Sequence, residues 1–241
     1  MRRFLFFKSK KNEEICVMRK PVIALDGYSS TGKSSISKII AQKLGLVHMD
    51  TGALYRGVTY FALQHCADAE GEIELNCVFS KLKEISLDFR QVGNELELFL
   101  NGNNISAEIR SNEVSANVSL IAAQKEVRDF LLGTQRSMAE NGGVILDGRD
   151  IGTVVFPDAD YKFFLTASIE ERTNRRFMEL QNLGIVTTMA QVQENLMKRD
   201  KIDSERKVAP LRQASDAILI DNTFLSKIGT IDLIMSHIKQ I

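Results

Sequence analysis

The sequence predicts an α/β fold: a doubly wound, five-stranded parallel sheet with an inserted α+β subdomain and a helical lid. Five short apolar runs recur with helical segments between them, and near-continuous runs are typical of parallel strands buried on both faces. The first run leads into a glycine-rich loop and a helix. A central block alternates apolar and polar residues, which indicates an insertion whose strands have one solvent-exposed face.

Each predicted strand is a short apolar run followed by polar or glycine residues. The five runs are residues 22–25, 46–50, 143–147, 161–165 and 217–221. Polar residues at the carboxyl ends of such strands, among them Asp50 and Asp147, are candidates to face a ligand. A helix is expected to begin after Thr51, capped by Asp50 or Thr51.

The segment after the first strand matches the phosphate-binding pattern G-x-x-x-x-G-K-[ST]. Glycines let the backbone wrap around a phosphate, and successive N–H groups at the start of the following helix form an anion nest. Lys33 is expected to reach the outer phosphates of a nucleotide, and the Ser34 hydroxyl to meet Mg²⁺. The nucleotide-binding residues are then Gly27, Tyr28, Ser29, Ser30, Thr31, Gly32, Lys33, Ser34 and Ser35.

Residues 64–140 are predicted to form the insertion. Residues 85–90 and 95–99 alternate with period 2 and are separated by a Gly-Asn pair, which predicts a hairpin. Residues 113–140 have helical character with an interruption near Gln124. We assign residues 20–63, 141–168 and 207–241 to the core of a single domain spanning residues 18–241.

Residues 169–206 are predicted to form the lid, as two short helices. Ser168-Ile-Glu-Glu171 reads as a capping box and Thr188-Met-Ala-Gln191 as a second helix start. Arginines recur at helical spacing on both helices, although charged faces often only contact water. These positions are Arg172, Arg175 and Arg176 on the first helix and Arg199, Asp203 and Arg206 on the second.

Composition narrows the classes of protein. The formal net charge is zero, so no global basic field favours nucleic acid, and no apolar run is long enough to span a membrane. Three cysteines without C-x-x-C spacing predict a reduced, cytoplasmic chain without a zinc site. Residues 1–17 are expected to be a flexible extension.

A phosphate-binding loop predicts nucleotide binding, and three classes of protein share it: a kinase for a small acceptor, a switch GTPase or ATPase, and a module that only binds nucleotide. The N-K-x-D motif of GTPases is absent from the sequence. Phosphoryl transfer needs many cations around the transferred group, and the surplus of arginines favours a kinase. Arginine forks left over after triphosphate binding suit an acceptor that is itself a phosphate monoester.

Several further motifs make the sequence resemble bacterial cytidylate kinases over about residues 20–241. They are Asp50-Thr-Gly-Ala-Leu-Tyr-Arg56, Glu108-Ile-Arg110, Asp147-Gly-Arg-Asp-Ile-Gly-Thr-Val-Val-Phe-Pro157, Arg199-Asp-x-x-Asp203-x-x-Arg206 and Ala209-Pro-Leu211. The resemblance implies a nucleoside-monophosphate-kinase fold and transfer of the terminal phosphate of ATP to CMP or dCMP, with Mg²⁺. It also implies a monomer with no nucleic-acid or membrane partner.

The resemblance implies roles for individual residues. ATP would bind Gly27–Ser35. Independently of the resemblance, Ser34 is a candidate direct Mg²⁺ ligand because it fits the general loop pattern, and Asp147 is a candidate to hold Mg²⁺ through water because it ends a strand beside the loop. The catalytic cations would be Lys33, Arg149, Arg175, Arg176 and Arg199. Ser119, Arg128 and Asp150 would read cytosine, Asp203 would contact the ribose, and Arg56, Arg149 and Arg206 would grip the acceptor phosphate. Together with Thr51 and Arg110, these seven residues form the predicted CMP site.

Some alternatives stay open at this point. A UMP-preferring nucleoside monophosphate kinase is the competing activity. Ser119 also fits an ordinary helix position, Arg128 a surface cation and Asp147 a structural cap, and we assign His48 no role. The family usually has Gly then Thr after the loop lysine, where this chain has Ser34 and Ser35, and commonly Pro in place of Tyr28.

Overall fold

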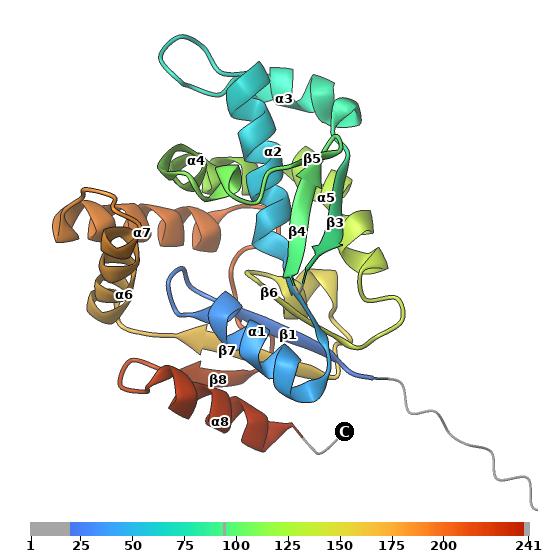
Figure 1. Ribbon diagram of the computed structural model, residues 1–241, viewed down its shortest axis with the longest axis vertical. Helices are drawn as coiled ribbons and strands as arrows, with labels where there is room; N and C mark the ends of the chain where they lie inside the picture. Colours follow the sequence, from blue (N-terminus) through green and yellow to red (C-terminus); the bar gives the residue numbers. More distant parts are fainter. Residues whose placement is uncertain (1–19, 94, 239–241) are drawn as a thin grey trace, which may run out of the picture.

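The computed structural model describes residues 20–93 and 95–238 (Figure 1). The predicted flexible extension of residues 1–17 lies outside the described residues. A five-stranded sheet forms the lower half of the view in Figure 1, a smaller three-stranded sheet with its helices forms the upper half, and a pair of helices stands at one side. Among the described residues, no helix is long and apolar enough to cross a membrane.

The large sheet confirms the predicted five parallel strands. Its order is β2-β6-β1-β7-β8, so the first strand is central and the chain winds outward from it in both directions. This reversal of winding creates the crevice at the carboxyl ends of the strands where doubly wound sheets bind ligands. The bounds are β1 Val22–Gly27, β2 Val47–Asp50, β6 Val144–Gly148, β7 Tyr161–Thr166 and β8 Ile218–Asp221.

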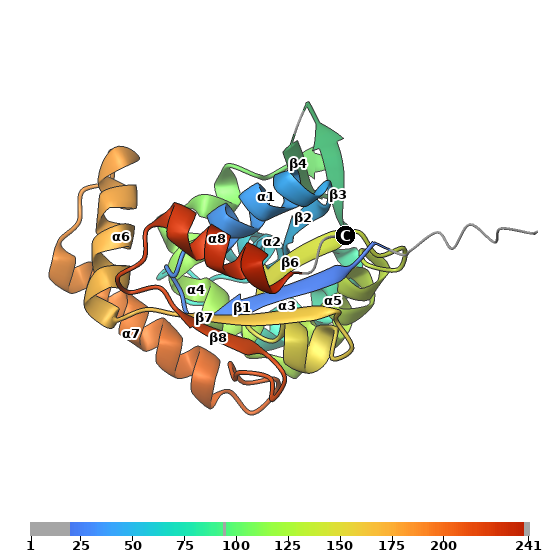
Figure 2. The ribbon, with the colours of Figure 1, turned by 90° about the horizontal axis from the view of Figure 1, so that it is seen from below.

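Both faces of β1 are buried, as its apolar run predicts. Ile23 and Leu25 pack in a cluster with residues of α1 (Lys33–Leu44) and α8 (Lys227–His237), which lie together over one face of the sheet (Figure 2). Val22 and Ala24 point to the opposite face, where they pack in a cluster bordered by α5 (Lys125–Ser137) and the π-helical turn η3 (Ile151–Val155). The alternation follows from the period of two in a strand.

The insertion contains the predicted hairpin. β3 (Leu87–Val92) and β4 (Glu95–Leu100) pair antiparallel, and β5 (Asn103–Asn104) extends them to three strands. The long helical segment is interrupted at residues 123–124 as predicted, although it ends earlier than expected, at Ser137. The remaining elements are α2 (Thr51–His65), α3 (Leu75–Lys81), η1 (Leu82–Glu84), η2 (Glu108–Arg110) and α4 (Asn112–Ala122).

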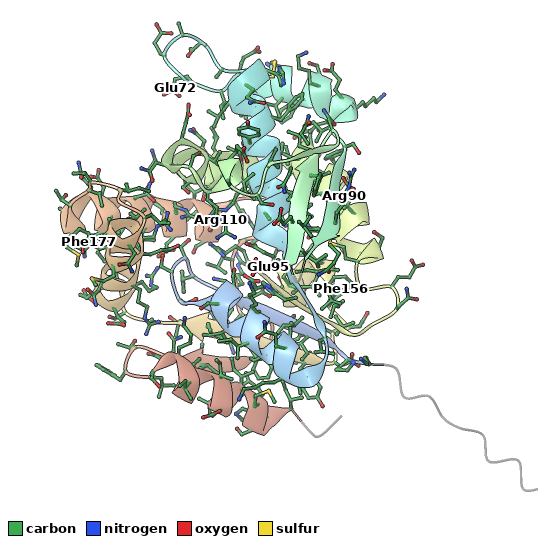
Figure 3. The ribbon with its side chains drawn as sticks, viewed as in Figure 1. Glu72, Arg90, Glu95, Arg110, Phe156 and Phe177 are labelled. Carbon is green, nitrogen blue, oxygen red and sulfur yellow. A yellow bond between two sulfur atoms is a disulfide. The ribbon has the colours of Figure 1, made fainter. Side chains whose placement is uncertain are left out.

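The insertion packs around α2 and contacts the core at a charged pair. Ala53, Leu54, Val58 and Phe61 of α2 belong to one cluster with apolar residues of α3, η1, β4, η2, α4 and α5. Leu87 and Phe89 of β3 pack against this cluster. At the near end of the hairpin, Glu95 points to α1, where Lys38 forms an ion pair with it (Figure 3).

Two helices, α6 (Ile169–Asn182) and α7 (Met189–Glu205), form a hairpin with its own small core of Leu180, Val192 and Leu196. Thr188 makes a complete capping box with Gln191, whereas the predicted box at Ser168 is only half formed. Ser168 accepts from the Glu171 N–H, but the Glu171 carboxylate pairs with Arg175 instead of reaching back. The helix α7 continues past Lys198 to Glu205, so Arg199 and Asp203 lie on one face of it, and Arg206 follows as its C-cap residue.

Two other local predictions are wrong. Asp50 is the N-cap residue of α2, but neither it nor Thr51 makes a side-chain capping bond there, because the Thr51 hydroxyl donates instead to the Asp147 carbonyl. The cysteines are not all reduced, because Cys66 and Cys77 form a disulfide with Cα atoms 5.6 Å apart. The bond joins the end of α2 to α3, two elements whose adjacency in space the cysteine spacing did not reveal.

Candidate active site

The phosphate-binding loop follows β1 at the centre of the sheet. A Cβ atom on Gly27 would lie 2.1 Å from the Leu165 carbonyl oxygen, so the loop leaves the strand closer to β7 than a side chain allows. Gly32 is the N-cap residue of α1 with φ of +89°, a conformation that glycine adopts without strain. The helix therefore begins at Lys33 and directs its N-terminal N–H groups toward the loop.

Lys33 is folded into this loop. Its Nζ donates to the Tyr28 carbonyl oxygen at 2.6 Å and lies 3.5 Å from Thr31 Oγ1, and the residue is only 6% exposed. Burial, with the nearby Arg149 guanidinium, lowers the pKa of the Lys33 ammonium well below its usual value. A phosphate beside Lys33 would favour its charged form.

Tyr28 stands where the resembling family commonly has proline. Its ring meets Phe164 edge-on at 6.0 Å, and the Arg172 guanidinium lies over it, 5.2 Å from the ring centroid. Arg172 also donates to the Ser29 carbonyl oxygen and pairs with Asp200 at 2.5 Å. Tyr28 thus joins the loop to the α6–α7 hairpin through Arg172, to which sequence reasoning gave no role.

Ser34 and Asp147, the two predicted magnesium residues, are in direct contact. The Ser34 hydroxyl donates to Asp147 Oδ2 at 2.6 Å, and His48 Nε2 lies 2.6 Å from Asp147 Oδ1. Asp50 is the register partner of Asp147 on the neighbouring strand β2. Burial, and then the Asp147 charge, raise the pKa of the Asp50 carboxyl. Two close carboxylates and a hydroxyl are a hard oxygen donor set of the kind that Mg²⁺ prefers.

Arg149 connects the loop to the α6–α7 hairpin. Its Nε donates to Asp203 Oδ2 on α7 at 2.9 Å, and one terminal nitrogen donates to the Ser29 hydroxyl at 2.8 Å. Burial lowers the pKa of the Arg149 guanidinium, but the Asp203 carboxylate outweighs it, so the pKa stands above its usual value. Arg149 therefore bonds both Asp203 and the loop, although the three belong to separate motifs in the sequence.

Asp150 joins two arginines from different elements. Its Oδ2 pairs with Arg128 of α5, and its Oδ1 accepts from Arg206 at 3.0 Å, just beyond α7. All three residues are at most 8% exposed. Arg128 also donates to the Ala122 carbonyl oxygen at 3.2 Å. Arg128 is therefore buried and is not the surface cation that the sequence left possible.

Asp26, the penultimate residue of β1, holds the turn that bears Arg149 and Asp150. Its two carboxylate oxygens accept from the N–H groups of Ile151 and Gly152 at 2.8 and 2.7 Å. Burial raises the pKa of the Asp26 carboxyl to about 6, although both hydrogen bonds oppose the shift. Asp26 therefore orients residues 149–152 relative to the phosphate-binding loop.

Arg56 and Arg199 lie in the same charged region. Arg56 donates to the Ser115 hydroxyl at 3.0 Å, and burial lowers its pKa. Arg199 is 8% exposed, forms no ion pair with the described residues, and its buried Nε has no hydrogen-bond partner among them. Burial, and then the charges of Arg56 and Arg149, lower the pKa of Arg199 to about 9. An anion between these guanidiniums would remove the repulsion and satisfy the Nε group.

Arg175 and Arg176, two of the predicted catalytic cations, take different positions. Arg175 turns toward the phosphate-binding loop, donating to Asn222 at 2.8 and 3.0 Å and approaching the Thr31 carbonyl oxygen at 3.5 Å. Arg176 instead pairs along its own helix with Glu179 at 2.9 Å. The i, i+1 spacing of the two arginines explains the difference, because adjacent residues on a helix point in directions about 100° apart.

The remaining predicted residues lie around the edge of this region. Thr51 is buried and donates to the Asp147 carbonyl oxygen at 2.8 Å. Ser119 is buried on α4, one turn before Ala122, and makes no side-chain hydrogen bond with the described residues. Arg110, at the end of η2, is exposed, and its charge contributes to the lowered pKa of Arg56 (Figure 3). Ser35 is also exposed, and its hydroxyl donates to the Gly32 carbonyl oxygen.

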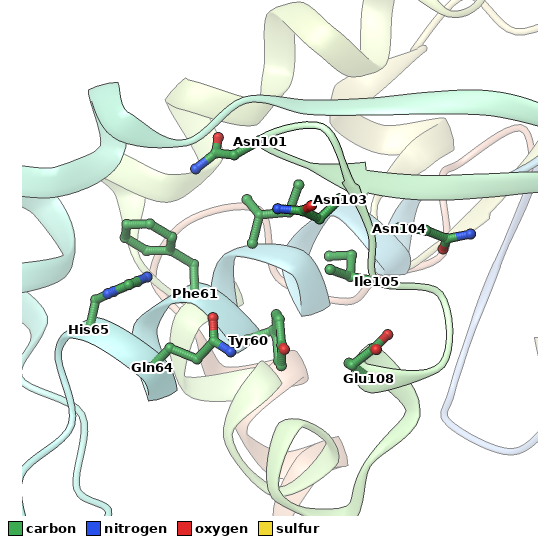
Figure 4. A pocket seen from close by; sticks show the side chains of 10 residues that line it. Tyr60, Phe61, Gln64, His65, Asn101, Asn103, Asn104, Ile105 and Glu108 are labelled. Atoms are coloured by element: carbon green, nitrogen blue, oxygen red, sulfur yellow. The ribbon is translucent and has the colours of Figure 1, made fainter.

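A cavity of about 330 Å³ lies elsewhere, on the insertion between the second half of α2 and the β4–β5 turn (Figure 4). Tyr60, Gln64 and Asn103 line it, over a floor that includes Phe61 and Ile105. No predicted site residue lines this cavity. In the charged region around the loop, arginines and aspartates of the turn and of the α6–α7 hairpin form ion pairs with one another.

Five residues of the site have roles that sequence reasoning missed: Arg172, His48, Asp26, Tyr55 and Gln135. The last two form a hydrogen bond of 3.2 Å next to Arg128. For His48 the sequence did contain a signal: it is two residues from Asp50 on a predicted strand, so the two side chains share a face. Their contact with Asp147 depends on β2 lying beside β6, and no pattern in the sequence gives that order.

A phosphate-binding loop on the central strand of a doubly wound sheet, with buried arginines from a turn and a helical hairpin around it, defines a P-loop kinase. The family model for cytidylate kinase matches residues 23–240, and the chain belongs to the cytidylate kinase family. A cytidylate kinase from Bacillus cereus is 44% identical over 91% of this chain and 96% of its own length. One from Bacillus anthracis is 46% identical over 85% of this chain and 89% of its own.

Proposed function

We propose that the protein transfers the γ-phosphate of ATP to CMP or dCMP, giving ADP and CDP or dCDP. The observation that supports this most directly is Arg199, a buried guanidinium with an unpartnered Nε beside Arg56 and Arg149. Such a group is costly unless an anion accompanies it, and a phosphate monoester is a dianion that bidentate guanidiniums bind well. Membership of the cytidylate kinase family supports CMP as that acceptor.

The proposal assigns roles to the residues gathered at the loop. Gly27–Ser35 hold the triphosphate, with Lys33 on its outer phosphates. Arg56, Arg149 and Arg206 grip the acceptor phosphate, and Asp203 contacts the ribose. Arg128, Asp150 and Ser119 read the base, where a guanidinium suits the carbonyl and ring-nitrogen acceptors of cytosine and a carboxylate suits its amino group. Thr51 and Arg110 complete the acceptor site.

The chemistry of the step is positioning and neutralisation of charge. The acceptor phosphate is already ionised and nucleophilic, so the transfer needs no general base. Arg149, Arg175, Arg176 and Arg199 would surround the transferred group, and closure of the α6–α7 lid would exclude water that competes as acceptor. Because half-buried Arg176 pairs with the exposed Glu179 side chain, its role requires that this pair separate when the lid closes.

The donor set of Ser34 and Asp147 fits Mg²⁺ bound together with nucleotide phosphates. Among the described residues there is no cluster of three or more histidine, cysteine or acidic side chains that would enclose a metal. Mg²⁺ in kinases is typically bound by one or two protein oxygens and by substrate phosphates, which agrees with this sparse set. When bound, the ion would neutralise charge developing on the transferred phosphoryl group.

The activity is tested with purified protein, ATP and Mg²⁺, by measuring ADP release with CMP, dCMP, UMP and AMP in turn. We expect efficient release with CMP and dCMP and a lower kcat/KM with UMP, because uracil reverses part of the donor and acceptor pattern of cytosine. Equal rates with AMP and CMP would disprove the cytosine assignment. ATP binding without any CMP-stimulated ADP release would instead indicate a nucleotide-binding module.

We expect Ser34→Gly to raise the Mg²⁺ concentration needed for half-maximal turnover by about tenfold, in the range seen when groups around a metal are removed. The hydroxyl lost by this change contacts Asp147 at 2.6 Å, so both predicted magnesium groups are affected. Turnover is titrated with Mg²⁺ at fixed ATP, with Ser34→Ala as a variant that keeps helix propensity and Ser236→Ala on α8 as a control. An unchanged Mg²⁺ dependence in both Ser34 variants would show that the hydroxyl does not bind the ion.

A further inference from the structure

A buried pair of polar side chains lies next to Arg128. Gln135 Nε2 donates to the Tyr55 hydroxyl at 3.2 Å, and the Arg128 guanidinium lies 5.3 Å from the centroid of the Tyr55 ring. Gln135 is 1% exposed and Tyr55 is 8% exposed. Polar groups buried to this degree destabilise a fold unless they are bonded, so the Gln135–Tyr55 bond is required once both groups are inside.

The geometry of α5 explains why these residues meet. Arg128 and Gln135 are seven residues apart, which is two helical turns, so both point from the same face of α5. Tyr55 comes from α2, and its side chain reaches this face with its ring at Arg128 and its hydroxyl at Gln135. Gln135 therefore bonds the hydroxyl of the same aromatic side chain whose ring lies against Arg128.

The orientation of the Arg128 guanidinium depends on few contacts. One terminal nitrogen donates to the Ala122 carbonyl oxygen and the other pairs with Asp150, which uses two of its five N–H donors. The Tyr55 ring supplies the contact over the guanidinium plane. Reading of a base edge by an arginine depends on the direction of that planar fork, so a rotation of the ring would redirect the remaining donors.

We propose that Gln135 is a positioning residue for selection of the acceptor base: by bonding the Tyr55 hydroxyl it fixes the ring that orients Arg128. This inference rests on the proposed function, in which Arg128 reads the acceptor. Gln135 does not touch the base or either nucleotide in this account. Its effect is on the discrimination between cytosine and uracil and not on the phosphoryl transfer step, which takes place at the loop and the lid.

The test is Gln135→Met, which keeps the length of the side chain and removes its hydrogen-bonding groups. We expect the ratio of kcat/KM for CMP to that for UMP to fall about tenfold, as befits a buried hydroxyl left without a partner. The fall should come from a higher KM for CMP, with kcat and the KM for ATP within twofold of wild type. Gln42→Met, on the exposed side of α1, is the matched control and should leave every constant unchanged.

Tyr55→Phe tests the same bond from its other end, because it keeps the ring and removes the hydroxyl. It should lower the CMP-to-UMP ratio to a similar extent, and the double variant should lose little more than either single variant, since only one bond is removed. Tyr55→Phe also decides the question if Gln135→Met fails to fold.

Two results would overturn the inference. The first is a CMP-to-UMP ratio within twofold of wild type in the folded variants, which would make the pair structural only. The second is an equal rise of KM for CMP, UMP and ATP, which would indicate general loosening of the site. A wild-type protein that shows no preference for CMP would contradict the proposed function itself, and that result is obtained before any variant is made.

Discussion

The Arg149→Ala variant is expected to lose about 10²–10³-fold in kcat, the range found when one preorganised charged or donor group is removed from a transition-state site. Arg149 lies between Ser29 of the phosphate-binding loop and Asp203 of the lid helix, at 2.8 and 2.9 Å. A guanidinium held between the two halves of the site is placed to neutralise charge as the phosphoryl group moves from donor to acceptor. The measurement is steady-state ADP release with saturating ATP and CMP.

The loss must be separated from damage to the fold, because Arg149 also neutralises Asp203. Arg149→Lys keeps a positive charge but cannot form the two-nitrogen bridge, so it should fall between wild type and Arg149→Ala. Arg90→Ala is the matched control, since Arg90 pairs with Asp88 on the exposed hairpin strand β3. A decrease of less than about fivefold in Arg149→Ala, with an unchanged melting temperature, would mean that Arg149 only connects loop and lid.

The five strands could be predicted because they are local patterns. An apolar run such as residues 22–25 marks a strand by itself, and its burial on both faces follows from the absence of alternation. The same holds for the hairpin, whose period of two and Gly-Asn pair are visible without knowledge of its neighbours. Strand order is a different kind of information, since the position of β6 between β2 and β1 depends on packing between segments about a hundred residues apart.

In the candidate site, too, the local motifs could be predicted and the contacts between distant segments could not. The loop and the Asp147–Asp150 turn are contiguous motifs, so their membership of one site could be predicted. The partner of each side chain could not: Glu171 has the sequence of a capping-box residue but bonds Arg175, and Cys66 and Cys77 form a bond that their spacing does not suggest. The first outcome is a competition between polar contacts of similar strength, and the second requires that the fold bring two cysteines within bonding distance, so tertiary geometry decides both.

Neutralising Asp150 should have the largest effect on stability. Asp150→Asn keeps the shape of the side chain but leaves the buried guanidiniums of Arg128 and Arg206 without their shared carboxylate. Breaking a buried ion pair by removing one partner typically costs about 3–5 kcal/mol, because the remaining charge stays desolvated. For a domain of this size each kcal/mol lowers the melting temperature by about 2–4 °C, so we expect a decrease of about 10 °C, measured by thermal unfolding.

The control for this change is Asp129→Asn on the same helix as Arg128. Asp129 pairs with Lys125 at the surface, where solvent screens the interaction, so its loss should leave the melting temperature close to that of wild type. Asp150→Asn should also weaken binding of CMP, because Arg128 and Arg206 then repel one another without the carboxylate between them. A variant as stable as wild type would show that these guanidiniums find other partners or water, and that Asp150 does not hold the acceptor arginines together.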